Sequence, residues 1–342
     1  MPGSRAIPLA FDALRNRGSY GCVKRRPFQC YFRSGGSAWR WCSGAQLRDA
    51  WIASIRVGAR QRSHPRPKVP CSEIRIPVSL PQFFLDEQVL ADEACEQFPL
   101  ALSRDDAKHA KVLRLAAGEH IAVVDAAQDY FECEIKAFDG GTPIVSISGH
   151  LDAKPLAAHV CLVQGLAKGD KMETVIRHAT ELGVSEFIPF AASRSIMKVD
   201  AKKSASKTER WQAIAKSAAM QSGQTHLAQV HEPMRLSALK DALASFDAVI
   251  LCWEEAPGTA KLCDALRPVS HIAPSDRLAR VAVVVGPEGG LAQEEVDAIL
   301  ACNDHARMVS LGSSILRTET AGIVAPALVL YELGGLGAGE RA

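Results

Sequence analysis

One stretch of the sequence decides the fold class: residues 281–302 read VAVVVGPEGGLAQEEVDAILAC. Five consecutive apolar residues, 281–285, predict a strand buried on both faces, as in a parallel sheet. The glycine-rich turn that follows, 286–290, leads into a segment with acidic residues at its start, which predicts a helix. A buried strand, a glycine turn and a helix together make an α/β unit whose turn lies at the carboxyl edge of the sheet.

The same alternation extends in both directions. Apolar runs and helical periodicities follow each other between residues 155 and 335, which predicts an α/β domain with a parallel sheet and helices on both faces. The expected strands are 159–164, 187–190, 248–252, 281–285 and 308–311. The expected helices include 172–179, ending at Gly183, 211–218, ending at Gly223, then 291–302, and 318–333 with a kink or packing constraint at Pro326.

Residues 75–151 carry a different pattern, in which short apolar runs are separated by glycine turns. The runs 121–125, 130–135 and 144–147 are expected to be strands, and their spacing is typical of a small barrel or sandwich. One helix is expected at 105–115, with acidic residues in its first turn.

The expected helix at 105–115 offers a candidate contact to RNA. Spacings of three and four residues place Lys108, Lys111 and Arg114 on a common side. Such a set of side chains is normally an ordinary solvated helix face, and its place in a small barrel beside a ligand-binding domain strengthens the case for a nucleic-acid contact. Further basic candidates for RNA contact are His109, Lys168, Lys171 and Arg194.

Charge is distributed unevenly along the 342 residues. Residues 1–74 hold 14 basic and 3 acidic side chains, a net charge of +11, and the remainder has a net charge of −9. Three interpretations of this basic leader stay open: an organelle transit peptide, an RNA-binding tail, or sequence upstream of the true start. The third is favoured because the leader holds Trp39, Trp41 and Trp51, and tryptophan is unusual in the other two.

Composition excludes several classes of protein. A hydrophobic fraction of 47% and a charged fraction of 23% are typical of a globular protein, and no apolar stretch reaches the ~20 residues of a membrane span. The ten cysteines include no C-x-x-C pair and no cluster with zinc-ligand spacing. We therefore expect no metal site, no disulfide framework and a cytoplasmic location.

Two loops at the ends of expected strands are the candidates for chemistry. Residues 286–290 read GPEGG, which matches neither the dinucleotide nor the nucleoside-triphosphate fingerprint. Because Glu288 and the acidic helix start repel phosphate, a cationic ligand fits this loop better, and a tight turn without a ligand is the alternative. Residues 311–321 read LGSSILRTETA and pass from a strand end into a helix. Loops at adjacent strand ends form one crevice.

These segments together resemble the RsmE family of small-subunit ribosomal RNA methyltransferases. The resemblance covers about residues 75–335 and rests most of all on GPEGG at 286–290 followed by LGSSILRTETA at 311–321. Supporting matches are KVLRL at 111–115, KGDKM at 168–172 and ATELGV at 179–184. The sequence departs from the family at QSGQ, 221–224, where an arginine often follows the glycine.

Proteins of this family use S-adenosylmethionine to methylate N3 of a specific uridine in 16S rRNA. The resemblance implies a PUA-like β-barrel at 75–151, a SPOUT methyltransferase domain with a trefoil knot at 155–335, and a tail at 336–342. It also implies a homodimer whose partner is 16S rRNA in the small ribosomal subunit, with no metal and no membrane.

The resemblance also implies roles for individual residues. Arg317 would stabilise negative charge that develops on the uracil oxygens, and Glu319 would act as a base or an orienting group. Contacts to the cofactor would come from Leu251, Cys252, Gly286, Glu288, Gly290, Leu311, Gly312, Ile315, Leu316, Thr320 and Ala321.

Two other functions stay open at this point. One is a non-catalytic RNA-binding protein with a degenerate SPOUT domain, which the intact residues 286–290 and 317–321 disfavour. The other is a nucleotide-dependent α/β enzyme, which the missing phosphate fingerprint disfavours.

Overall fold

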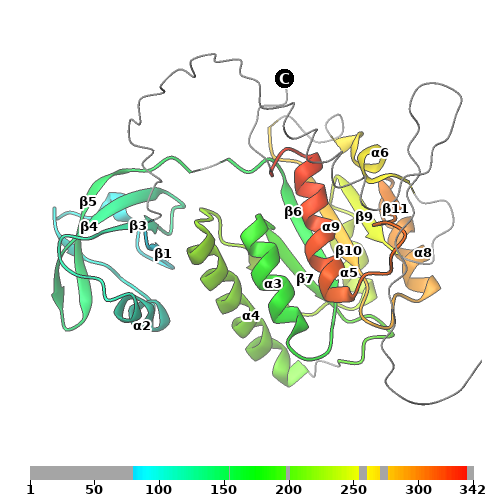
Figure 1. Ribbon diagram of the computed structural model, residues 1–342, viewed down its shortest axis with the longest axis horizontal. Coiled ribbons are helices and arrows are strands. Elements are labelled where there is room, and N and C mark those ends of the chain that lie inside the picture. The colour runs from blue at the N-terminus through cyan, green and yellow to red at the C-terminus, as the bar shows by residue number, and fades with distance from the viewer. Residues whose placement is uncertain (1–79, 154, 198–200, 254–259, 270–275, 337–342) are drawn as a thin grey trace, which may run out of the picture. The chain divides into compact units, whose positions relative to one another are not determined.

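The carboxyl-terminal part of the chain folds around a parallel sheet, as the alternation of apolar runs and helical segments predicts (Figure 1). The computed structural model describes residues 80–153, 155–197, 201–253, 260–269 and 276–336. Two expectations concern segments outside these residues: the leader at 1–74 and the tail at 336–342, of which only Leu336 is described. In spatial order the strands are β11 (Ala306–Val309), β9 (Ala248–Cys252), β10 (Arg280–Val285), β6 (His159–Gly165), β7 (Glu186–Phe190) and β8 (Gln229–Val230), and every neighbouring pair is parallel.

Helices cover both faces of this sheet, as expected (Figure 1). One face carries α3 (Lys171–Leu182), α4 (Ala201–Ser222), α6 (Leu262–Leu266) and α9 (Thr318–Glu332), and the other carries α5 (Leu236–Leu243) and α8 (Gln293–Ala301). Helix α3 ends at Gly183, whose φ of 101° is the left-handed conformation that glycine adopts without strain. Its amide there bonds the carbonyls of Ala179 and Thr180.

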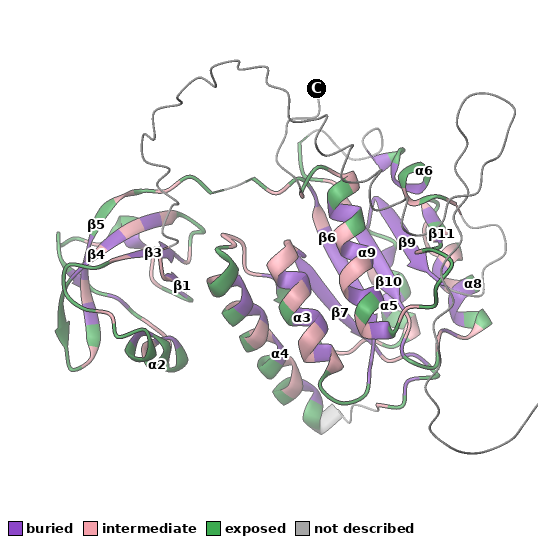
Figure 2. Ribbon diagram, in the orientation of Figure 1, coloured by how far each residue is buried: buried purple, intermediate pink, exposed green. Residues whose placement is uncertain are grey.

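The strands are buried because their alternate side chains enter two separate hydrophobic clusters. In β10, Val283 packs in one cluster with Val175 of α3, whereas its neighbour Val284 packs in the other with Val296 of α8. Both valines have no exposed surface, and the purple strands in Figure 2 show that this holds along the central sheet. Burial on both faces explains why the sequence of this strand is continuously apolar.

Residues 80–150 form a second, mixed sheet with its own core. Its order is β1 (Gln82–Phe84), β3 (His120–Val124), β4 (Tyr130–Asp139), β5 (Thr142–His150) and β2 (Phe98–Pro99), with β1 and β3 parallel and the other pairs antiparallel. A short 3-10 helix, Leu90–Asp92, and helix α2 (Arg104–Val112) complete it. Helix α2 begins at Ser103, whose hydroxyl accepts a hydrogen bond from the amide of Asp106.

Several element boundaries differ from the expectation. Helix α2 ends at Val112, three residues early, so Arg114 is not on the helix and has a left-handed φ of 56°. Arg114 therefore does not continue the side of Lys108 and Lys111 as its spacing predicted. Strand β11 ends at Val309, two residues before the predicted end, and α9 continues through the buried Pro326. Helix α4 begins ten residues before the predicted segment, and the sequence pattern did not predict β1, β2, β8, α5 or α6.

Candidate functional site

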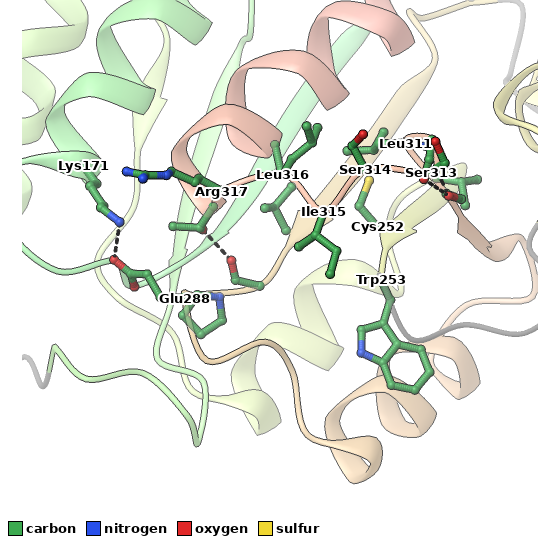
Figure 3. Close-up of a pocket in the computed structure, with 18 residues that line it drawn as sticks. Lys171, Cys252, Trp253, Glu288, Leu311, Ser313, Ser314, Ile315, Leu316 and Arg317 are labelled. Atoms are coloured by element: carbon green, nitrogen blue, oxygen red, sulfur yellow. Dashed lines mark hydrogen bonds and ion pairs between the residues drawn. The ribbon is translucent and has the colours of Figure 1, made fainter. Parts of the chain in front are cut away.

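A pocket lies at the carboxyl ends of three neighbouring strands of the parallel sheet, β9, β10 and β11 (Figure 3). Its volume of about 430 Å³ is in the range of small-molecule sites. The walls come mainly from two segments, residues 285–288 and residues 309–318, together with Cys252 and Trp253. The structure therefore joins the two loops that the sequence predicted to form one crevice.

The GPEGG turn at 286–290 passes very close to other parts of the chain. A Cβ atom at Gly165, at the end of β6, would overlap the backbone of Pro287. A Cβ atom at Gly289 would lie 2.9 Å from the carbonyl oxygen of Arg194. Gly290 has a φ of 69°. Three glycines are therefore needed so that this wall packs against β6 and the loop after β7.

The second wall, residues 309–318, presents both apolar and polar side chains to the pocket. Leu311, Ile315 and Leu316 line it, and 84% of Ile315 is exposed. The hydroxyl of Ser310 accepts a hydrogen bond from the amide of Gly312, whose φ of 127° favours glycine. This turn gives the segment its direction into α9.

A hydrogen bond ties the two walls together at the start of α9. Thr318 Oγ1 donates to the carbonyl oxygen of Gly286 at 2.6 Å and accepts a bond from Gln164 Nε2 at 2.8 Å. Gln164 comes from β6 and Gly286 follows β10, so two strand ends meet the start of α9 at this point. Thr318 and Gln164 are both buried, which makes the link more costly to break.

Lys171, the first residue of α3, links the walls through charge. Its Nζ lies 3.0 Å from Oε1 of Glu288 and 3.1 Å from Oε2 of Glu319. Burial alone would raise the pKa of Glu288, but hydrogen bonds from its own backbone amide and from Lys171 outweigh burial and lower the pKa. The pKa of Glu319 is also lowered, first by its own backbone amide and then, against the effect of burial, by Lys171. Both carboxylates are therefore ionised at neutral pH.

Adjacent residues at the end of β9 point to opposite faces of the sheet. Cys252 lines the pocket, and burial raises the pKa of its thiol to about 12. Leu251 does not line the pocket, because its side chain packs in the hydrophobic cluster on the other face. Alternation along a strand was the signal in the sequence that separates these two residues.

The structure brings most of the residues predicted for the cofactor into this pocket. Those that line it are Cys252, Gly286, Glu288, Leu311, Gly312, Ile315, Leu316 and Ala321. Leu251, Gly290 and Thr320 are not in its wall, and Arg317, which was predicted to be catalytic, is. Glu319 is not in the wall but pairs with Lys171, which is. The prediction missed Trp253, Val285, Pro287, Val309, Ser310, Ser313, Ser314 and Thr318, most of which adjoin predicted residues.

The residues predicted to contact RNA come from several elements of the chain. Lys108 and Lys111 lie on α2, where Lys108 pairs with Asp105, and His109 stacks edge-on against Phe83. Arg194 lies beside the GPEGG turn, with Nη1 3.5 Å from the carbonyl oxygen of Gly289. Lys171 belongs to the pocket. Lys168 is in the loop before α3, and Arg114 follows α2.

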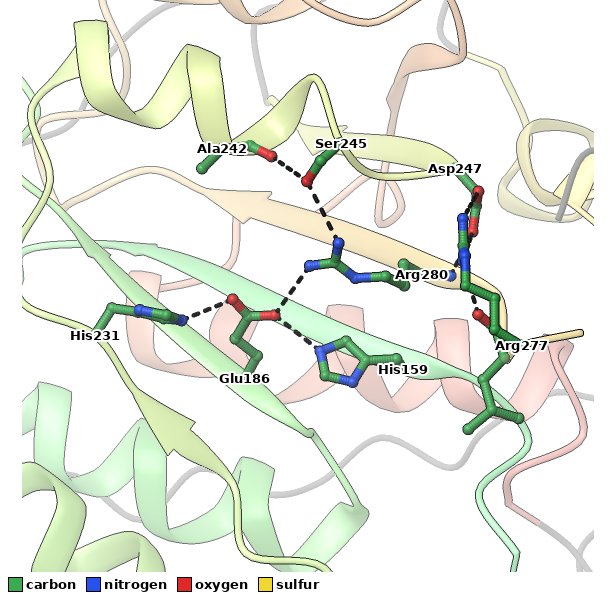
Figure 4. Close-up of polar contacts among 9 residues, drawn as sticks. His159, Glu186, His231, Ala242, Ser245, Asp247, Arg277 and Arg280 are labelled. Atoms are coloured by element: carbon green, nitrogen blue, oxygen red, sulfur yellow. Dashed lines mark hydrogen bonds and ion pairs between the residues drawn. The ribbon is translucent and has the colours of Figure 1, made fainter. Parts of the chain in front are cut away.

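A second polar cluster lies at the opposite, amino edge of the parallel sheet (Figure 4). Glu186 accepts contacts from His159 Nε2 at 2.8 Å and from His231 Nε2 at 2.7 Å, and Arg280 lies 3.6 Å away. Burial alone would raise the pKa of Glu186, but the two histidines outweigh it and hold the pKa well below its ordinary value. Because the surrounding strands all begin here, the cluster holds the amino ends of β6, β7 and β10 together.

No group of three or more potential metal ligands comes together among the described side chains. In the same part of the chain, no helix combines the length and the apolar character that a bilayer requires.

Comparison with known proteins defines the class first. Residues 154–330 match the family of RNA methyltransferase domains, and this range holds the whole parallel sheet and the pocket. The "Ribosomal RNA small subunit methyltransferase E" of Bacillus subtilis (strain 168) is 32% identical over 248 residues, which cover 71% of this chain and 94% of that protein. The protein of the same name from Mycobacterium bovis is 30% identical over 226 residues, which cover 65% of this chain and 82% of that protein. The chain belongs to this family, the RsmE family.

Solved structures agree with this assignment. A methyltransferase from Legionella pneumophila, solved with bound cofactor SAM, superposes with a TM-score of 0.62 at 25% identity over 74% of this chain and 97% of that chain. Ribosomal RNA small subunit methyltransferase E from Neisseria gonorrhoeae, bound to S-adenosyl methionine, gives a TM-score of 0.59 at 25% identity with the same coverage. The fold of this chain is therefore shared with structures that hold that cofactor.

Proposed function

We propose that this protein uses S-adenosylmethionine to methylate ribosomal RNA of the small subunit, at N3 of the uridine at position 1498 of 16S rRNA. The observation that carries the proposal is one pocket at the carboxyl edge of the parallel sheet, walled by GPEGG and by LGSSILRTETA. Membership of the RsmE family and the cofactor in two relatives support it.

The residues present fit this cofactor. The faces of its adenine ring are flat and apolar, which suits the side chains of Leu311, Ile315 and Leu316. Its methionine part carries a sulfonium and an ammonium, which suit the ionised carboxylate of Glu288. Glycines at 286 and 312 let a ligand approach the backbone of both loops.

Bound in this way, S-adenosylmethionine supplies a methyl group that is already activated for transfer to a nucleophile. The protein must then prepare the uridine, whose N3–H is a weak acid. Arg317 precedes α9 in the pocket wall, with no hydrogen bond from its side chain to the helix end. A guanidinium here stabilises the negative charge that spreads onto the uracil oxygens as N3 loses its proton.

Glu319 is proposed to orient the uracil. A carboxylate whose pKa is lowered is a weak base, so Glu319 accepts the N3–H hydrogen bond and passes the proton on to solvent water rather than keeping it. The sequence left two roles open for Glu319, a base and an orienting group, and its lowered pKa favours the orienting role.

The remaining parts of the proposal concern assembly. Residues 75–151 form a PUA-like β-barrel that binds RNA with Lys108, His109, Lys111 and Arg114, and the segment 155–335 is a SPOUT domain whose carboxyl-terminal part forms a trefoil knot. The link from Thr318 to both Gly286 and Gln164 supports such a threaded arrangement. Lys168 and Arg194 flank the pocket and extend the RNA surface.

The exposed apolar side chains Ile315 and Leu328 support a homodimer, since a partner copy would cover them. Because the substrate is ribosomal, the proposed compartment is the cytoplasm.

The test is methyl transfer from labelled S-adenosylmethionine to small ribosomal subunits that lack the modification, followed by nucleoside analysis. The full chain and a chain that begins at Arg75 are compared. We expect 3-methyluridine from both. Binding of the cofactor without transfer to these subunits would contradict the proposed target, and RNA binding without cofactor binding would favour a non-catalytic protein.

A further inference from the structure

Lys171 joins two carboxylates that come from separate walls of the pocket. Its Nζ lies 3.0 Å from Glu288 in the turn after β10, a contact drawn in Figure 3. The same Nζ lies 3.1 Å from Glu319 in the first turn of α9. The three side chains are 29%, 24% and 21% exposed, so water screens these pairs only in part. Both contacts are close enough to act as charge-assisted pairs.

Among the described residues, the charge of Arg317 also lowers the pKa of Glu319, but Arg317 is not within ion-pair distance of that carboxylate. Neither Glu288 nor Glu319 has a second lysine, arginine or histidine within ion-pair distance in that part of the chain. The backbone amide of Lys168 adds a hydrogen bond to Oε1 of Glu288 at 3.0 Å, which fixes the oxygen that Lys171 also contacts. The ammonium of Lys171 thus shares one positive charge between two carboxylates, and the three side chains together keep a net negative charge.

We propose that Lys171 is a positioning residue of the methyl-transfer site, which holds Glu288 and Glu319 at one ammonium and so aligns the cofactor wall with the substrate wall. This inference rests on the proposed function. It gives Lys171 a different role from the RNA contact that its place in the sequence predicted. Two carboxylates surround the ammonium, and their negative charge repels a phosphate.

The role has a consequence that loss of packing would not produce. Without the ammonium, two carboxylates face the same small space, and their repulsion raises the pKa of one of them. Protonation of a carboxylate removes negative charge from the pocket, so affinity for the cationic S-adenosylmethionine falls as the pH is lowered. The uncharged sulfur of S-adenosylhomocysteine makes that ligand less sensitive.

The experiment measures the dissociation constants of both ligands by titration calorimetry between pH 5.5 and pH 8, with the full chain. For the unmodified protein we expect each dissociation constant to change less than about twofold over this pH range. In K171M the dissociation constant of S-adenosylmethionine should rise about 3- to 10-fold from pH 8 to pH 5.5, and that of S-adenosylhomocysteine clearly less. Turnover should fall about 10- to 100-fold at saturating RNA, because the walls lose their alignment.

Three variants isolate the cause. K171R keeps a cation that bonds two carboxylates, so it should restore the flat pH profile. K171M/E319Q leaves a single carboxylate, so the pH dependence should disappear even though the ammonium is still missing. R210M removes the exposed pair between α4 and Glu173 of α3 and should leave binding and turnover unchanged. Thermal unfolding of each variant shows that it is folded.

Three results would overturn the inference. If K171M lowers the affinity for both ligands equally at every pH, Lys171 is only structural. If K171M behaves as R210M does, Lys171 is dispensable. K171M that weakens only RNA binding and lowers its salt dependence would make Lys171 a phosphate contact. Failure of the unmodified protein to bind S-adenosylmethionine would instead contradict the proposed function.

Discussion

Gln164 and Thr318 are hydrogen bonded side chain to side chain at 2.8 Å although 154 residues separate them in the sequence. The bond is buried, and Thr318 passes the connection on to the carbonyl of Gly286. One threonine hydroxyl therefore fixes the end of β6, the GPEGG turn and the start of α9 relative to one another. The shape of the pocket depends on this contact.

We expect T318V to lower the free energy of unfolding by about 1–3 kcal/mol. The carbonyl of Gly286 loses the hydroxyl that donates to it, and the buried amide of Gln164 keeps only its 3.2 Å bond to the carbonyl of Gly165. Affinity for S-adenosylmethionine should fall as well, since the two walls are no longer tied. T318S keeps the hydroxyl and should lose much less of both. Chemical unfolding and calorimetric titration measure the two effects, and equal behaviour of T318V and T318S would contradict the role of the hydroxyl.

Gly322 in α9 should not tolerate a side chain, although alanine normally stabilises a helix interior. A Cβ atom there would overlap Oε1 of Gln164 and lie 3.1 and 3.2 Å from the two methyl carbons of Val175. We expect G322A to lower the free energy of unfolding by about 1–3 kcal/mol. G149A is the control, because a Cβ atom at Gly149 meets nothing within 4 Å. An increase of stability in G322A would show that the helix relaxes without cost.

The cluster around Glu186 should make folding sensitive to acid. Its carboxylate has a lowered pKa in the folded state, so the stability it supplies is present above its ordinary value of about 4.5 and is lost as the pH falls below that value. Burial lowers the pKa of His226, so protonation in the unfolded state begins to favour unfolding below about pH 6.5. Both shifts have the same sign, and the free energy of unfolding should decrease from pH 8 to pH 4.

The variant E186Q separates the first contribution. We expect it to lose roughly 3 kcal/mol at pH 7, since two histidines and Arg280 lose a buried anion. Its stability should also change less between pH 5 and pH 4 than that of the unmodified protein. E132Q, which removes the half-exposed partner of His120, should cost less than about 1 kcal/mol. Parallel pH profiles for E186Q and the unmodified protein would refute the assignment.

Arg317 should matter for turnover and not for cofactor affinity. Removing a group that stabilises charge in the transition state costs about 10²–10³ in kcat. R317A should therefore lose turnover on this scale while the dissociation constant of S-adenosylmethionine changes less than about threefold. R317K tests whether charge alone suffices. An equal loss of turnover and of cofactor affinity in R317A would assign Arg317 to cofactor binding instead.

Much of the fold is local in origin and was predicted from the sequence. The strands β6, β9 and β10 are runs of apolar residues long enough to be buried on both faces, and α3 carries both its periodic apolar side and its stop at Gly183. The elements that were not predicted, such as β8 and α6, have two and five residues, too few to show a period. Their structure comes from the elements they pack against.

The sequence by itself determined the family, the α/β class and the two loops of the pocket, because each is written in consecutive residues. The tertiary structure alone decided that Lys171 lies between Glu288 and Glu319 and that Gln164 reaches Thr318. The physical reason is that charge pairing and buried hydrogen bonds depend on distance in space. Periodicity reports which face a residue occupies, and only the packed sheet determines what that face meets.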